Sequence, residues 1–83
     1  MAQFRATVVV TLQPDVLDPA GDATAQVLRH MGYRVADVRI GKSIEVRLEA
    51  EDRAEAQALA HKMAASLLAN PVMETFSVQV EEL

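Results

Sequence analysis

The chain has 83 residues, 51% of them hydrophobic, which suffices for one domain over residues 1–83 with a small core and leaves apolar surface for a partner. Its net charge of −4 and its content of only three aromatic residues argue against nucleic-acid binding. The lack of cysteine excludes disulfides and thiolate metal sites and is typical of cytoplasmic proteins. No apolar run reaches the roughly 20 residues that a membrane-spanning helix requires, so we predict a cytoplasmic protein without a membrane segment.

The first part of the chain changes from a strand pattern to a helix pattern. From Phe4 to Leu12, apolar side chains occupy every second position, which predicts a strand with one buried face. Asp18 then provides an N-cap, and Pro19 occupies the first helical position, where its missing N–H costs nothing. Apolar residues keep helical spacing up to Met31, so we predict a helix over residues 19–31.

The second part of the chain repeats this sequence of patterns. Residues 35–49 alternate on both sides of Gly41 and Lys42, which predicts a β-hairpin with glycine in its turn. A D-x-x-E capping box precedes a helical pattern over residues 53–68, and Asn70-Pro71 ends it because the residue before proline avoids helical angles. Residues 72–80 alternate again and predict a last strand.

The predicted order of elements is β-α-β-β-α-β. This order is typical of the ferredoxin-like sandwich of the α+β class, in which two helices cover one face of an antiparallel sheet. The second predicted strand, residues 35–40, lies at an edge of that sheet, and only two charged side chains protect it from pairing with another chain. We therefore expect the domain to form homo-oligomers.

The sequence shows no group of residues suited to catalysis. His61 has no second ligand at the spacing of a helical metal pair, and the three glycines are too far apart to form a phosphate-binding loop. Acylphosphatase shares the predicted topology, but residues 13–18 lack the glycines and the arginine that its phosphate loop requires. We therefore predict no catalytic residue, no metal and no cofactor on this chain.

Three stretches of the sequence resemble the PurS family, the small subunit of phosphoribosylformylglycinamidine synthase in purine biosynthesis. They are Asp18-Pro19-Ala20-Gly21, Val38-Arg39-Ile40-Gly41-Lys42 and Leu67-Leu68-Ala69-Asn70-Pro71-Val72. The resemblance implies a subunit of a glutamine- and ATP-dependent ligase that carries no catalytic site itself. It also implies a dimer or tetramer that bridges a PurQ-type glutaminase and a PurL-type synthetase and supports ammonia transfer between them, with ATP and Mg²⁺ used by the synthetase.

The resemblance also suggests where partners bind. The expected interface lies at the hairpin tip and at the corner between the last helix and the last strand, and its residues are Arg39, Gly41, Lys42, Asn70, Pro71 and Val72. Each residue has a structural alternative, since Gly41 could serve the turn and Asn70-Pro71 could simply end the helix. A different function, a regulatory domain of the ACT type that binds an amino acid, would require a glycine-bearing turn after the first strand, where residues 12–17 have no glycine.

Overall fold

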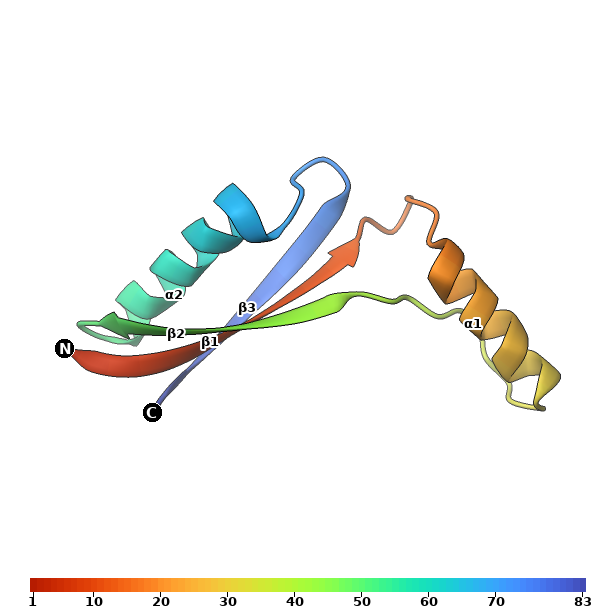
Figure 1. The fold of residues 1–83 in the computed structure, drawn as a ribbon, viewed down its shortest axis with the longest axis horizontal. Helices are drawn as coiled ribbons and strands as arrows, with labels where there is room; N and C mark the ends of the chain where they lie inside the picture. The colour runs from red at the N-terminus through yellow and green to blue at the C-terminus, as the bar shows by residue number, and fades with distance from the viewer.

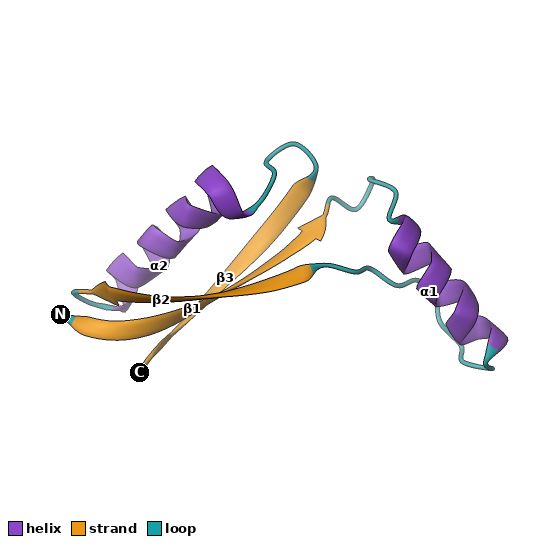
Figure 2. Ribbon diagram, viewed as in Figure 1, coloured by secondary structure: helices purple, strands orange, loops and turns teal.

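The computed structural model describes residues 1–83, which form a three-stranded antiparallel sheet and two helices (Figures 1 and 2). The strand order is β2-β1-β3, so the first strand lies in the centre. The helix α2 continues without interruption into a π-helical turn, η1. The elements are β1 (Ala2–Leu12), α1 (Pro19–His30), β2 (Lys42–Ala50), α2 (Arg53–Met63), η1 (Ala64–Leu68) and β3 (Glu74–Glu82).

The central strand β1 has one buried face, as its alternating sequence predicts. Phe4, Ala6, Val8 and Val10 are almost completely buried on this face, and Val8 faces Ile44 of β2 and Val78 of β3. The other face of the sheet carries mainly polar side chains, with Val9 as an exposed apolar exception. These two faces follow from the two-residue period of side chains along a strand, which places all even-numbered residues of β1 on the covered side.

Helix α2 covers the apolar face of the sheet through alanines. Ala56 and Ala60 of α2 and Ala64 of η1 are fully buried, and their small side chains let the helix axis approach the strands closely. The predicted cap is present, because the carboxylate of Asp52 accepts a hydrogen bond from the Glu55 N–H at 2.8 Å. The predicted helix over residues 53–68 is confirmed, with its last five residues in π-helical form.

The predicted α+β class and ferredoxin-like arrangement are confirmed, but α1 lies away from the sheet instead of covering it. Figure 1 shows α1 and the segment that follows it projecting from one end of the sheet, and we call residues 13–41 the arm. The arm stretches the chain to 51 × 27 × 14 Å and gives a radius of gyration of 16.1 Å. A compact domain of this length would have about 12 Å. The single chain is therefore far from its most compact form.

The predicted hairpin over residues 35–49 is wrong in its first half. Residues 35–41 form no strand, and β2 pairs with β1 alone. The physical reason is that backbone groups of this segment hydrogen-bond to α1 and its N-cap instead of to a strand. Arg29 donates to the carbonyls of Val35 and Ala36 at 2.9 and 2.7 Å, and the Ile40 N–H donates to the Asp18 carboxylate at 2.9 Å. The sheet of one chain consequently has three strands where four were predicted.

Candidate protein-binding site

The predicted interface residues gather at one end of the sheet, where β1 ends and β2 and β3 begin. Gly41 and Lys42 line a shallow hollow of about 270 Å³ together with Glu74 of β3. Glu74 also lines a second hollow of about 370 Å³, to which Pro71 contributes. The structure thus brings the two predicted stretches, 29 residues apart between Gly41 and Asn70, close to Glu74, which lines both hollows.

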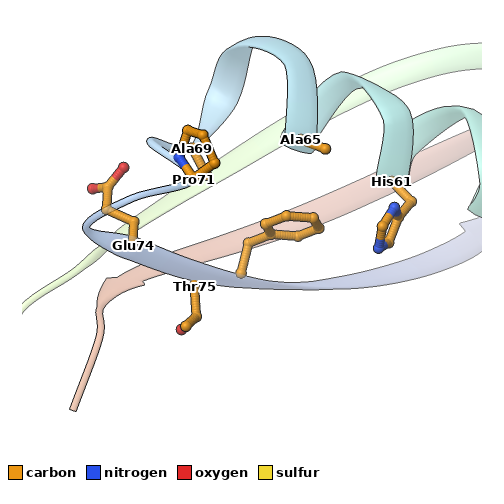
Figure 3. Close-up of a pocket in the computed structure, with 7 residues that line it drawn as sticks. His61, Ala65, Ala69, Pro71, Glu74 and Thr75 are labelled. Carbon is orange, nitrogen blue, oxygen red and sulfur yellow. The ribbon is translucent and has the colours of Figure 1, made fainter. Parts of the chain in front are cut away.

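The larger hollow lies between the end of α2 and the start of β3 (Figure 3). Phe76 lines it, and its ring meets that of His61 edge to face with the centroids 5.0 Å apart. Ala65, Ala69 and Pro71 form an apolar wall, and Glu74 lies at the rim. This His61 is therefore a packing residue beside an aromatic ring, in a hollow of a size that accepts one or two apolar side chains of another protein.

The corner between η1 and β3 is held by Asn70. Its side-chain oxygen accepts hydrogen bonds from the N–H groups of Val72 and Met73 at 2.9 and 3.3 Å, and its own N–H donates to Glu74 at 2.7 Å. This geometry leaves the side chain of Val72 82% exposed, with Leu67 on η1 83% exposed. Asn70 therefore has a structural role, and it presents apolar side chains to solvent at the corner.

Arg39 and Gly41 also have structural roles at this end of the sheet. The Arg39 guanidinium donates to the carbonyls of Gln13 and Val16 at 2.8 and 3.2 Å, which ties the loop after β1 to the arm. A Cβ atom on Gly41 would lie 2.3 Å from the Val10 carbonyl oxygen. Gly41 is thus required because its backbone lies close to β1, and not for the turn that the sequence suggested. The side chain of Lys42 is exposed. The predicted contacts of these residues with partners stay predictions.

Asp18 does more than the sequence predicts. One carboxylate oxygen accepts from the Gly21 N–H at 2.9 Å, which confirms the N-cap, and the other accepts from Ile40, 22 residues further on. The hydrogen bonds from the Ile40 and Gly21 N–H groups, together with the Arg39 charge, hold the pKa of Asp18 below its ordinary value despite its burial. A single carboxylate therefore fastens the start of α1 to the end of the arm, and no local pattern could have indicated the Ile40 contact.

The Asp18 contacts predict a pH-dependent arm. Because the pKa is lowered by folding, the stabilisation is fully present above the unfolded value of about 3.9 and is lost as the pH falls through the folded value. We expect Asp18→Ala to lower the protection factors of the Gly21 and Ile40 amides at pH 7, and acid that protonates Asp18 to lower them likewise in the unmodified chain. Unchanged protection of the Ile40 amide in Asp18→Ala, measured by NMR, would contradict this role.

The Asn70 contacts predict that this side chain acts as an acceptor. Asn70→Ala leaves two N–H groups without their partner and is expected to lower the free energy of unfolding by about 1–2 kcal/mol. Asn70→Asp keeps the acceptor oxygen and should retain most of the stability. Urea denaturation followed by circular dichroism measures both, and equal losses in the two variants would show that the acceptor is not what matters.

The fold and the site together define the class: a small α+β protein of the ferredoxin-like kind, with apolar side chains displayed at one end of its sheet. Comparison with known proteins identifies it further. Residues 5–82 match the family model for PurS, described as phosphoribosylformylglycinamidine (FGAM) synthase. The chain belongs to the PurS family, as the resemblance predicted, and this decides against the ACT-type alternative.

Individual relatives agree with this assignment. The chain is 44% identical over 81 residues to the phosphoribosylformylglycinamidine synthase subunit PurS of Synechocystis, a match that covers 96% of this chain and 81% of the relative. It is 42% identical to the same subunit of Bacillus subtilis, covering 96% and 95%. Among solved structures, Thermus thermophilus PurS superposes with a TM-score of 0.88 at 41% identity, covering 98% of both chains. None of the helices combines the length and apolarity needed to cross a bilayer.

Proposed function

We propose that this protein is the subunit of a cytoplasmic phosphoribosylformylglycinamidine synthase that joins a glutaminase to an ATP-dependent synthetase. The observation that carries the proposal is the likeness to a chain of the PurLQS structure from Thermotoga maritima, with 37% identity and a TM-score of 0.85 over 100% of both chains. That structure has PurL, PurQ and PurS together. We assign this chain the PurS place between a PurL-type and a PurQ-type partner.

The chemistry of such an assembly explains why a connecting subunit is useful. The glutaminase hydrolyses glutamine to glutamate and ammonia, and the synthetase uses ATP to activate the amide oxygen of its substrate as a leaving group. Ammonia then replaces that oxygen and gives the amidine, with ADP and phosphate as the other products. Ammonia that meets bulk water is lost by escape or protonation, so a subunit that fixes the two active sites in register raises the yield of transfer.

In this proposal the chain supplies surfaces, and ATP and Mg²⁺ bind the PurL-type partner. The exposed corner at Val72 and the hollow lined by Phe76 and Pro71 are suited to receive apolar side chains of a partner. Lys42 and Glu74 beside them add charges at the rim. Apolar contact surrounded by charge is the usual composition of a protein interface.

We also propose that the chain forms a dimer or tetramer. The arm carries large apolar side chains that remain well exposed in the single chain, which are Leu17, Val27, Met31, Tyr33 and Ile40. Together with the radius of gyration of 16.1 Å, they indicate that the arm is covered by another molecule in the assembled protein.

Reconstitution with and without this chain tests the proposal. A PurL-type synthetase and a PurQ-type glutaminase are assayed for amidine formation with either glutamine or ammonium chloride as the nitrogen source. We expect omission of the chain to abolish the glutamine-dependent rate and to leave the ammonium-dependent rate nearly unchanged. A full glutamine-dependent rate without the chain would overturn the proposed function.

A further inference from the structure

We infer that the larger hollow binds an arginine side chain of one catalytic subunit, with the guanidinium against the Glu74 carboxylate and the aliphatic stem against Phe76. The inference rests on the proposed function and specifies what one partner presents to this chain. It follows from three features of the site: a half-buried carboxylate without a cation, an otherwise uncharged surface around it, and walls that suit an aliphatic stem with a flat cationic head.

Glu74 is a half-buried carboxylate that lacks a cation in its own chain. All ion pairs of the structure involve Arg5, and Lys42, which lines the smaller hollow together with Glu74, does not pair with it. One oxygen of Glu74 accepts from the Asn70 N–H at 2.7 Å, and the other accepts no hydrogen bond from the chain. Because charges that are partly removed from water are normally paired, the second oxygen is a place for a donor from another molecule.

The surface around Glu74 has no other charge from the same part of the chain. Between Met63 and Val80, Glu74 is the only acidic or basic residue. Leu67 and Val72 are well exposed at the same corner. Apolar side chains that surround a charged pair exclude water from it, which is the arrangement of a hot spot at a protein interface. A single carboxylate in such a surface favours one cationic side chain of a partner over an extended basic patch.

The walls of the larger hollow suit a long aliphatic stem. Figure 3 shows Glu74 at one end of the hollow, next to Pro71, and His61 at the other end, with Ala65 on the wall between them. The volume of about 370 Å³ accommodates one long side chain. An arginine has three methylene groups before its guanidinium, and such stems pack along apolar surface while the head stays at a polar group. An occupant that lies along the wall therefore brings its head to Glu74.

Other occupants fit the hollow less well. A leucine or phenylalanine side chain would take water away from the free oxygen of Glu74 without giving it a donor, and leaving a polar group unpaired in this way costs free energy. A lysine supplies a donor, but its compact ammonium group is strongly hydrated. Guanidinium is planar and more weakly hydrated, and it stacks on aromatic rings. The Phe76 ring in the lining thus favours arginine.

The charge of the whole chain acts in the same direction. A net charge of −4 attracts a basic surface at long range and raises the rate of association with it. Added salt screens this attraction, so the affinity for the partner should fall as the salt concentration rises. The contact at Glu74 should account for a measurable share of this salt dependence.

Replacing Glu74 with glutamine tests the contact, because it removes the charge and keeps an oxygen that can accept from the Asn70 N–H. We expect Glu74→Gln to keep the urea midpoint of the original chain and to weaken binding to one catalytic subunit about 30-fold, with a smaller salt dependence. Glu82→Gln makes the same change at the other end of β3, where the side chain is exposed, and should leave binding unchanged. Equal affinity of Glu74→Gln and the original chain for both subunits, measured by titration calorimetry, would overturn the inference.

Photo-cross-linking identifies the side chain that enters the hollow. A benzophenone-bearing residue takes the place of Leu67, which is exposed at the same corner, and the assembled complex is irradiated and digested. We expect mass spectrometry to find a segment of one catalytic subunit that contains an arginine. Replacing that arginine with glutamine should weaken binding to the original chain and have no further effect on binding to Glu74→Gln. A segment without arginine, or losses that add up in the double variant, would contradict the inference.

The same measurements separate this inference from the proposed function. If Glu74→Gln binds both subunits like the original chain, and the original chain restores glutamine-dependent turnover, the arginine contact is wrong and the proposed function stands. If Glu74→Gln weakens self-association in sedimentation equilibrium and leaves binding to the subunits unchanged, the hollow belongs to a second copy of this chain and the inference is wrong. If the original chain binds neither subunit, both the inference and the proposed function are overturned.

Discussion

Replacing Phe4 with alanine is expected to lower the free energy of unfolding by about 3–5 kcal/mol. Phe4 is 1% exposed and is the largest fully buried side chain, packed in a cluster with Ala50, Ala56 and Ala60. The surrounding alanines are too small to close the cavity that its loss would leave. A chain of 83 residues has a total stability of only about 4–12 kcal/mol, so much of the Phe4→Ala protein should be unfolded at 37 °C.

Phe76 provides the matched control for this prediction. It has the same side chain on the same face of the sheet, but it is only half-buried against His61 at the edge strand β3. Phe76→Ala should therefore cost roughly half as much as Phe4→Ala. Urea denaturation of the two variants makes the comparison, and equal losses would show that the stability of the sheet does not depend on the cluster around Phe4.

The elements that follow from local patterns were predictable from the sequence. The alternation that begins at Phe4 and the capping box at Asp52 depend on residues at most a few positions apart, and both elements form as expected. Alanines at every fourth position of α2 also have a clear outcome, since Ala56 and Ala60 contact the chain's own sheet. Such features are decided by side-chain period and capping, which a single sequence contains.

The path of the arm was not predictable in the same way. Alternation over residues 36–40 and 44–48 predicts two strands that pair with each other, but in this structure residues 36–40 pair with no strand. The contacts that hold the arm open, such as that of Asp18 with Ile40, join residues far apart in sequence. The error in the predicted hairpin therefore arises from these distant contacts, which hold residues 35–41 against α1.

The candidate site was predictable in its location and less so in its parts. The stretches around Lys42 and Pro71 do meet at one end of the sheet, because β2 and β3 both begin there beside the end of β1. No local pattern indicated that the side chains of Asn70 and Arg39 hydrogen-bond to backbone groups of the chain itself, or that Glu74 lines the hollows beside both stretches. This leaves Lys42, Pro71 and Val72 as the predicted residues whose side chains are free for a partner.

Val72 is the residue at which we expect the largest effect on assembly. Its side chain is 82% exposed at a corner whose backbone is held by Asn70, so a change there alters the surface without disturbing the core. Apolar anchors at the centre of an interface commonly contribute about 2 kcal/mol or more to binding. We expect Val72→Asp to weaken binding to at least one catalytic subunit by about 30-fold and to lower glutamine-dependent turnover at limiting concentrations.

Leu83 separates this effect from a general response to added charge. It is 52% exposed at the opposite end of the sheet, where the C-terminus lies far from the corner (Figure 1). Leu83→Asp adds the same carboxylate and should leave binding unchanged, while both variants keep the urea midpoint of the original chain. Equal binding by Val72→Asp and the original chain, measured by titration with each subunit, would remove the corner from the interface. The contrast between two exposed apolar residues on one sheet thus tests whether partners bind at the end where β1 stops and β2 and β3 begin.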